Sequence, residues 1–532
     1  MATYYFRNTG NTDWGLASNW SLTDGGGPTA PNFPTSSDDV IFTNNSGNVL
    51  VGPNRNTRNL SFTNWAGSIN LNGVLMRVYG NLDFGSNLWT YSNPGIWQMG
   101  STVGVMNGQT IQTNGRAIPG TLSFGYATGT NPVVLLGDIT CGALRIESAV
   151  GSASVNIFTG FTMYVTGSIS TMSAGRQLRA STPIIMIGTG TITTFDSSAF
   201  IGSNITINTA GTITFSGTVC FQERTLTYIA GTVNNAGSTL VVNNATTLNT
   251  IGINWNNVLF NGTSATLTLT TDLHCNQFTM GVNNKTINGA NIYNAGNLYA
   301  PSNTGNVQGT STIIMNGTGT INAAGGAYFG INIIINTIGT ITLSSFNYGI
   351  ATFKYISGTI INSGTLTTVQ GSATLDTAGM SFLNVSTNGS YTTLSLPTLL
   401  TVTGKLSFPS NTTIINGAGG FTCSGLSIGS GTLTLPAGVT NTVTATMSCL
   451  TATLAAKALI NCSTVGGTKA ILKLAPDAIQ DNGYLSATDV DSSGGRSLWT
   501  YKGVLTRTSN WNLMPTSPKK QVIKHGNMIM KY

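Results

Sequence analysis

The sequence predicts an all-β protein, and more narrowly a parallel β-helix (β-solenoid), from its composition, its alternation and its repeats. Only 7% of the 532 residues are charged, while 40% are hydrophobic and 66 are glycine; globular domains usually have about 25% charged residues. Glutamate occurs only at Glu147 and Glu223, so the chain lacks the residues that cover helix surfaces. Thr, Asn, Ser and Gly alternate with Ile, Val, Leu and Phe, which is typical of short strands joined by tight turns.

A short repeat sets the expected length of a coil. Elements of the form Gly-x-(Leu/Ile/Val) recur in two series at nearly even spacing. The first series begins at Gly120, Gly142, Gly167, Gly190, Gly211 and Gly231, and the second at Gly319, Gly339 and Gly358. This spacing predicts coils of about 20–25 residues, each with two or three short strands stacked in register on the coil below. A leucine-rich repeat would need a Leu ladder and an Asn at a fixed offset, and the sequence has neither.

A longer duplication overlies the short repeat. Residues 184–192 return at 313–321 with an offset of 129, residues 207–214 at 335–342 with an offset of 128, and residues 228–233 at 355–360 with an offset of 127. We therefore expect a duplicated block covering about 184–260 and 313–387, with two single-residue deletions. These deletions should fall in turns, because a one-residue slip in a strand would exchange its inner and outer faces.

The two ends of the chain differ from its middle. Of the eight tryptophans, five lie within the first hundred residues, and Trp499 and Trp511 lie within the last thirty-four. An open solenoid end exposes unpaired backbone groups, so both ends should be capped by small β elements. We expect a Trp-rich N-terminal β cap over residues 1–60, a solenoid rod over 61–470, and a C-terminal cap over 471–532. The last of these ends in a basic tail that contains Lys519, Lys520, Lys524, His525 and Lys531.

Charge, cysteine spacing and hydropathy narrow the class of protein. The net charge of +7 is spread thinly, so we expect no nucleic-acid partner. The six cysteines form no C-x-x-C pair, which predicts buried thiols rather than a zinc site and fits a reducing compartment. No apolar run reaches the ~18 residues of a membrane span, so we expect no membrane insertion. The first residues lack the apolar core of a signal peptide, so we expect delivery by another route, such as assembly into a virus particle released by lysis.

The strongest catalytic candidates are Asp196 and Glu223, whose separation is close to the length of one coil. Solenoid enzymes that cut polysaccharides use carboxylates on neighbouring coils as acid and as nucleophile or base, and Arg224 could serve an anionic sugar. The alternative is a surface carboxylate beside a cation, and Asp376 in the second copy has no Glu beside it. With only two histidines, of which His274 is expected to be a half-buried strand residue, a nucleophilic triad is disfavoured. We therefore expect no catalytic residues, with a polysaccharide depolymerase as the alternative.

A calcium loop is a second candidate site. Asp489, Asp491 and Ser493 hold the first, third and fifth places of a calcium-binding loop and Gly494 holds the sixth, but Thr500 stands at the twelfth, where a bidentate Glu belongs. We expect a turn capped by Asp and Ser side chains and no cofactor, with bound calcium as the alternative.

Tryptophans near the N-terminus are candidate glycan contacts. A flat aromatic face suits the apolar face of a sugar ring, so Trp14, Trp20 and Trp65 could bind a glycan. The alternative is that these rings pack the core of the N-terminal cap.

Five short segments near the two ends of the chain carry a resemblance. Residues 14–21 (WGLASNWS), 24–27 (DGGG) and 34–42 (PTSSDDVIF), with 491–499 (DSSGGRSLW) and 509–513 (SNWNL), are similar to phage tail-fibre-like and adhesin-like virion surface proteins. These motifs cover about 7% of the chain, and related openings occur in cellular adhesins. The resemblance implies a structural protein on the virion surface, a β-helical fibre or adhesin that binds a host-surface polysaccharide or receptor.

That family membership would also imply partners and a location. The expected partners are other virion proteins and the host glycan, and a homotrimer is plausible because viral fibres are often threefold. The location would be the virion surface, or else the extracellular space or cell surface. A capsid-decorating or filament-forming subunit is an alternative function, and the resemblance carries over no catalytic residues.

Overall fold

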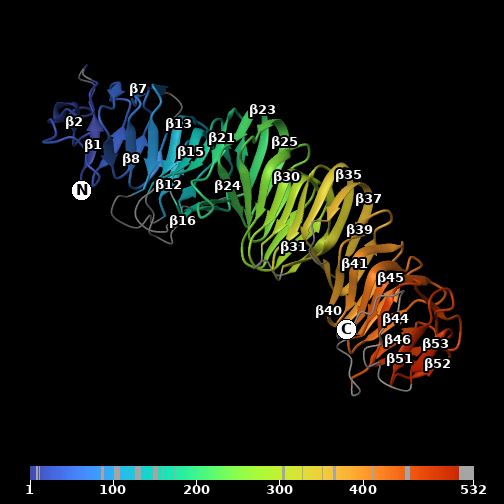
Figure 1. The fold of residues 1–532 in the computed structure, drawn as a ribbon. Coiled ribbons are helices and arrows are strands. Elements are labelled where there is room, and N and C mark those ends of the chain that lie inside the picture. The colour runs from blue at the N-terminus through green and yellow to red at the C-terminus, as the bar shows by residue number, and fades with distance from the viewer. Residues whose placement is uncertain are drawn as a thin grey trace, which may run out of the picture. The chain divides into compact units, whose positions relative to one another are not determined.

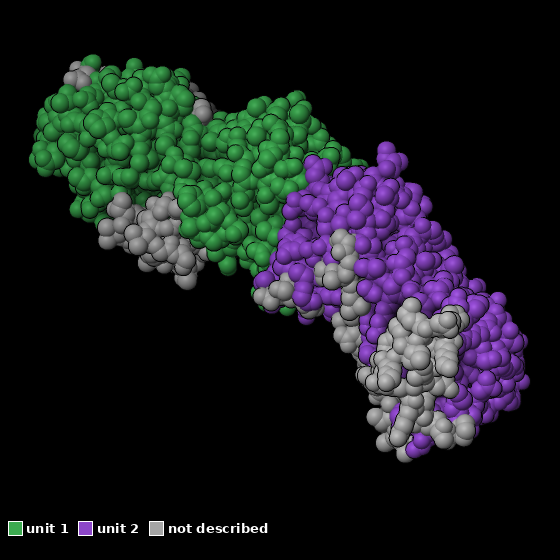
Figure 2. All heavy atoms as spheres, in the orientation of Figure 1, with its two compact units in different colours: residues 1–273 green, residues 274–532 purple. Residues whose placement is uncertain are grey.

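Strands dominate the computed structural model of the chain (Figure 1), and the one helix among the described residues is the short 3-10 turn η1 (Ala17–Asn19). The structure describes the chain except residues 8–9, 11, 86–88, 101–107, 126–132, 148–153, 158–159, 173, 176, 302–305, 326, 350, 363–366, 410–411, 450–455 and 515–532. Within this described part, no helix has the length and apolar character to cross a membrane. The chain divides into two compact units, unit 1 (Met1–Leu273) and unit 2 (His274–Tyr532) (Figure 2).

Unit 1 is a stack of coils whose strands pair in parallel with the strands of the next coil. Its first coils contain three short strands each: β3 (Asp39–Phe42), β4 (Val49–Leu50) and β5 (Arg55–Thr57), followed by β6 (Leu60–Phe62), β7 (Ser68–Asn70) and β8 (Leu75–Val78). Val40 pairs with Leu60, Val49 with Ile69 and Arg55 with Met76. The separation within each pair agrees with the coil length that the repeat predicts, and the fold is the expected all-β parallel β-solenoid.

The N-terminal cap is shorter than the predicted range 1–60, because the parallel coils already include β3. Residues 1–38 cover the first coil. β1 (Thr3–Phe6) pairs in parallel with the outer edge of β3, and β2 (Trp20–Ser21) pairs with β1 in the antiparallel direction and closes that sheet. The edge of β4 is covered by Thr12 and Trp14, which exchange backbone hydrogen bonds of 2.6 and 3.0 Å with Leu50. The antiparallel strand ends the ladder, which leaves fewer free backbone groups at this end.

Unit 2 continues the parallel pattern through much of the range 471–532 that the sequence assigns to a C-terminal cap. β49 (Leu485–Thr488) pairs with β52 (Leu505–Thr506), and β51 (Leu498–Tyr501) pairs with β53 (Trp511–Met514). Coil stacking therefore extends to the last strand of the described chain. The predicted basic tail, with Lys519, Lys520, Lys524, His525 and Lys531, lies outside the described residues.

The core follows the two-residue period of the strands. In β29 (Ala265–Leu269), for example, residues 265, 267 and 269 are buried and the two threonines between them are partly exposed. All six cysteines are buried and unpaired, which confirms the predicted buried thiols. Loss of solvation raises the pKa of five of them to about 12: Cys141, Cys220, Cys275, Cys423 and Cys449.

The duplicated block forms the same coils twice, once in each unit. In unit 1, β20 (Ile184–Met186), β23 (Ile205–Phe215) and β25 (Thr225–Asn234) stack in that order. In unit 2, the stack is β33 (Asn306–Met315), β35 (Tyr328–Ser345) and β37 (Thr352–Asn362). Ile184 pairs with Ile205 and Ile313 with Ile333, so the equivalent step is shorter by a single residue in the second copy. The deletion leaves the buried faces in phase, as the sequence predicts.

Candidate functional site

The two carboxylates that the sequence singled out lie at opposite ends of a strand pair. Asp196 precedes β22 (Phe200–Gly202), whereas Glu223 directly follows β24 (Thr218–Gln222), and these parallel strands pair at Ile201 and Phe221. The length of β24 alone separates them by on the order of 13 Å. A glycosidase pair must flank one bond at roughly 5–10 Å, so the structure does not bring these residues together as a catalytic pair.

Both carboxylates accept hydrogen bonds that favour the ionised form, Asp196 from its own turn and Glu223 from Gln222 beside it and from the turn of the next coil. Asp196 accepts bonds of 2.6 Å from Oγ and 2.8 Å from N of Ser198, and these lower the pKa of its carboxyl. Glu223 accepts a bond of 2.9 Å from Nδ2 of Asn244 and one of 3.3 Å from Nε2 of Gln222, with the same effect on its pKa. A general acid needs a raised pKa to keep its proton at neutral pH. Asp196 thus caps its own turn, and Glu223 links the amide side chains of two neighbouring coils.

The three tryptophans proposed to bind glycans are core residues. Trp14, Trp20 and Trp65 are each 0% exposed, so no ring face is open to a sugar. Nε1 of Trp20 donates to the carbonyl of Trp14 at 2.8 Å, and the two rings meet edge to face at 4.8 Å. Nε1 of Trp65 donates to the carbonyl of Ser46 at 3.1 Å. The glycan-stacking expectation is corrected, because these rings fill the interior where the cap meets the first coils.

In the proposed calcium loop, donors from the protein already bind the acidic side chains. Asp489 forms an ion pair with Arg507, whose Nε lies 2.6 Å from Oδ1, and this contact lowers the pKa of the carboxyl. Asp491 accepts hydrogen bonds from the hydroxyl and the backbone N–H of Ser493, the latter at 2.9 Å. Within the described part of the chain, no group of three His, Cys, Asp or Glu residues could hold a metal ion. The arrangement matches the side-chain-capped turn.

His274 lies partly exposed on β30 (Leu273–Met280), as expected for a half-buried strand residue. Its ring stacks on Tyr293 of β32 (Ile292–Ala300), with centroids 4.8 Å apart and planes 6° from parallel. The stacking partner is one coil away, and the geometry gives the imidazole a packing role.

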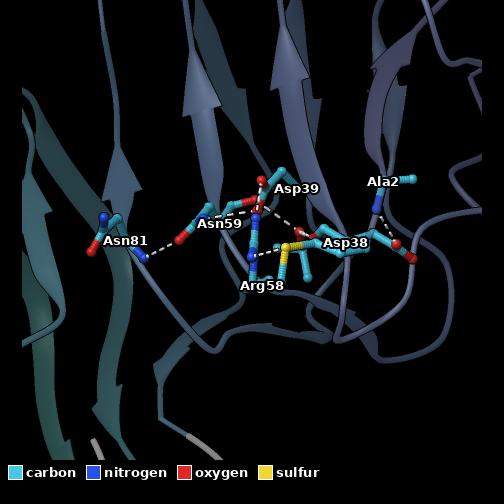
Figure 3. Close-up of polar contacts among 8 residues, drawn as sticks. Ala2, Asp38, Asp39, Arg58, Asn59 and Asn81 are labelled. Carbon is cyan, nitrogen blue, oxygen red and sulfur yellow. Dashed lines mark hydrogen bonds and ion pairs between the residues drawn. The ribbon is translucent and has the colours of Figure 1, made fainter. Parts of the chain in front are cut away.

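A polar network joins the cap to the first coils, and sequence reasoning missed it (Figure 3). Arg58 pairs with both carboxylate oxygens of Asp39, with its Nε 2.7 Å from Oδ1. Asn59 donates to the same oxygen at 2.8 Å, and its own Oδ1 accepts the backbone N–H of Asn81 at 2.7 Å. Asp38 accepts the backbone N–H of Ala2 at 3.0 Å. The available signal was the spacing of Asp39, Asn59 and Asn81, which each stand at or directly before a strand of one ladder.

A second set of hydrogen bonds forms a corner of the coil in the first duplicated block. We call the exposed or partly exposed residues Thr189, Asn208, Tyr228 and Ile229 arc corner 1. Oη of Tyr228 donates to the carbonyl of Gly231 at 2.7 Å across the bend. Oγ1 of Thr189 accepts the backbone N–H of Thr212 at 3.2 Å. Gly231 has a φ of 125°, a conformation that favours glycine.

The equivalent corner in unit 2 repeats these contacts. Arc corner 2 consists of Thr318, Asn336, Tyr355 and Ile356. Oη of Tyr355 donates to the carbonyl of Gly358 at 2.7 Å, and Gly358 has a φ of 127°. Oγ1 of Thr318 accepts the backbone N–H of Thr340 at 3.2 Å. The two corners are thus built from the same side-chain contacts and the same backbone bend.

The chain matches no protein-family model, no curated protein and no solved structure. Any functional assignment must therefore come from the β-solenoid fold and the chemistry of its own surface.

Proposed function

We propose that this chain is a structural protein of a virus particle, most simply of a phage. It would act as a β-helical fibre or adhesin on the particle surface and attach the particle to host-surface glycans. The observation that carries the proposal is the sparsely charged, repeated hydrogen-bonding surface of the coils.

Polar side chains at the turns form ladders between successive coils. Oδ1 of Asn48 accepts the backbone N–H of Ser68 at 2.9 Å, and Oδ1 of Asn204 accepts that of Thr225 at 3.1 Å. In unit 2, Oδ1 of Asn297 accepts the backbone N–H of Thr320 at 2.9 Å. These bonds satisfy backbone groups that the turns leave unpaired, so the coils can end in Asn and Thr without charged residues.

Such a surface suits glycans better than it suits charged partners. Amide and hydroxyl groups both donate and accept hydrogen bonds, as sugar hydroxyls do. Charged residues make up 7% of the sequence, so attraction to nucleic acid or to an anionic membrane would be weak. Many weak and equal contacts along a repeated surface can add up to firm attachment.

Attachment to the particle requires a second partner, which we propose to be another virion protein. The resemblance to tail-fibre-like proteins includes residues 14–21, and this segment lies in the cap that covers the first coil. A homotrimer would fit the same role, and analytical ultracentrifugation of the purified chain would test it.

The decisive experiment incubates the purified protein with immobilised bacterial capsular polysaccharides and follows both binding and release of reducing ends. We expect binding without release. The double variant Asp196→Asn/Glu223→Gln is the control, and it should bind as the wild type does. Release that the double variant loses would replace the adhesin by a depolymerase. Regular self-association without glycan binding would favour a capsid-decorating or filament-forming subunit.

A further inference from the structure

The two copies of the duplicated block differ on one face and agree on another. After a duplication, packing constrains buried residues, whereas exposed residues are free to change. The face that carries the carboxylate candidates has changed: Phe195, Asp196 and Glu223 correspond to Ala324, Gly325 and Ile350 in the second copy. A function that required Asp196 and Glu223 would therefore not be repeated along the chain.

The arc corners, in contrast, keep part of their solvent-facing residues, although neighbouring exposed positions such as Ala210 and Ile338 differ. Four exposed residues are identical in the two copies, namely Thr189 and Thr318, Asn208 and Asn336, Ile229 and Ile356, and Thr232 and Thr359. Beside them, the partly exposed tyrosines Tyr228 and Tyr355 are also identical. This corner is the surface that the duplication has preserved.

Turn geometry explains the threonines and glycines of the corner but not its isoleucines. Ile229 is 59% exposed and Ile356 is 52% exposed, so most of each side chain packs against nothing. A further exposed isoleucine lies near each corner but at a different place: Ile251 is in the coil after Ile229, Ile338 is in the coil before Ile356, and their equivalents in the other copy are alanines. Ile229 and Ile356 are therefore the exposed apolar residues that the two corners share.

A buried hydroxyl without a partner accompanies each corner. Thr250 lies opposite Tyr228 in the next coil, because the residues before them, Asn249 and Thr227, pair. Thr377 lies opposite Tyr355 in the same way, because Asp376 pairs with Lys354. Both threonines are 0% exposed, and their Oγ1 atoms have no hydrogen-bond partner. Two equivalent unpaired hydroxyls are costly to the fold, and because both threonines are fully buried, a buried water and not a surface ligand would satisfy them.

We infer that the chain is bivalent, and that arc corners 1 and 2 are equivalent binding sites for a glycan built from repeating, uncharged sugar units. The isoleucine and the tyrosine ring offer apolar surface to the C–H face of a sugar ring, while Asn208 or Asn336 and the adjacent threonine can hydrogen-bond its hydroxyls. None of the four residues that define each corner is charged, and Lys354, the charged side chain beside Tyr355 in corner 2, forms an ion pair with Asp376, which matches a neutral sugar. This inference rests on the glycan attachment proposed above and assigns it to two places.

Bivalency has a consequence that one site cannot produce. A polymer that engages both corners binds the second one intramolecularly, so its affinity exceeds that of a single repeat unit by a factor of about 10²–10⁴ when the geometry permits. A single repeat unit should instead occupy two independent sites per chain with equal affinity.

The test compares wild type with Ile229→Asp, Ile356→Asp and the double variant. Ile479→Asp is the matched control, because Ile479 is equally exposed, at 59%, but lies outside the block. The probes are whichever immobilised capsular polysaccharide binds the wild type and the oligosaccharide repeat unit prepared from it. Calorimetry gives the number of oligosaccharides bound per chain, and biolayer interferometry gives the affinity for the polymer. Thermal melting identifies misfolded variants, which the milder Ile229→Thr and Ile356→Thr would then replace.

We expect two oligosaccharides per wild-type chain, one per single variant with an unchanged dissociation constant, and none for the double variant. The affinity for the polymer should fall at least about tenfold in each single variant. A wild-type stoichiometry of one, or wild-type binding by the double variant, would overturn the bivalent sites and leave glycan attachment standing. If the wild type bound no polysaccharide, glycan attachment would fail, and the bivalent sites would fail with it.

Discussion

Lys285 is a buried cation at the start of a short strand. It is the first residue of β31 (Lys285–Gly289), it is 0% exposed, and its Nζ donates to the carbonyls of Val282 and Asn283. Removal from water disfavours the charged form and lowers the pKa of the amine to about 8. The pKa in the unfolded chain is about 10.4, so the folded state binds this proton less tightly than the unfolded state does.

This difference predicts that the contribution of Lys285 to stability rises with pH. Below pH 8 the amine is protonated in both states and its burial lowers stability by the full amount, whereas between about pH 8 and 10.4 the folded amine loses its proton first. The contribution of Lys285 to the free energy of unfolding should therefore increase by about 3 kcal/mol across that window. The raised pKa of the buried thiols lowers total stability over the same range, so the difference between wild type and Lys285→Met, followed by urea denaturation from pH 7 to 10.5, measures the lysine alone. The exposed Lys405→Met is the control, and an equal loss of slope there would contradict the assignment to Lys285.

The buried cysteines predict a chemically inert native state. Only the thiolate attacks a disulfide reagent, and five of the six thiols have a pKa of about 12 and are buried. We expect fewer than one thiol per chain to react with Ellman's reagent in native buffer and all six to react in guanidinium. Rapid reaction of one native thiol would identify a coil that opens locally.

At the scale of single elements, the arc corners predict equal energetics in the two copies. Tyr228 and Tyr355 each donate one 2.7 Å hydrogen bond across the bend, and such a bond contributes about 1 kcal/mol. Tyr228→Phe and Tyr355→Phe should each lower the free energy of unfolding by that amount, as measured by chemical denaturation. Tyr299→Phe, on the exposed side of β32, is the control. Losses that differ severalfold between the two variants would show that the corners are not equivalent.

The glycine at the bend should be harder to replace than the tyrosine. At Gly358 the φ of 127° strains any L residue, and an added Cβ would lie 2.8 Å from Cγ2 of Thr337. We expect Gly358→Ala to destabilise the chain by about 1–3 kcal/mol. The control Gly137→Ala adds a methyl group where nothing lies within 4 Å, and it should have little effect on the melting temperature.

The solenoid could be predicted from the sequence because one period controls both strand phase and turn position. The cap boundaries could not, since clustered tryptophans indicate an aromatic core and say nothing about where strand pairing changes direction. The expected pairing of the two carboxylates was wrong because of the strand register. Asp196 and Glu223 are further apart in the chain than the local coil step, which runs from Ile201 to Phe221. The excess is long enough to move one carboxylate to the other end of the strand.

At the scale of the whole molecule, the arc corner, which both copies share, and the face with Asp196 and Glu223, which differs between them, lie at different positions around the coil. The face with Asp196 and Glu223 is particular to unit 1, while the arc corner occurs in both units. The face with Asp196 and Glu223 carries reactive side chains, so it can be recognised in the sequence. The arc corner can be recognised only when exposed residues of the two copies are compared, and the structure is needed to show which residues are exposed.

The N-terminal cap leads to a prediction about self-association. Residues 1–38 cover the outer edges of β3 and β4 and the aromatic side chains beneath them, among which Phe42 and Trp65 are fully buried. A chain that begins at residue 39 would expose unpaired strand edges beside an apolar surface, the combination that promotes edge-to-edge association. We expect this truncated chain to form larger assemblies than the full-length chain in light scattering coupled to size exclusion. A truncated chain with the same mass distribution as the full-length chain would show that the first coil protects its own edge, and the cap would then be free to serve as the attachment point to the particle.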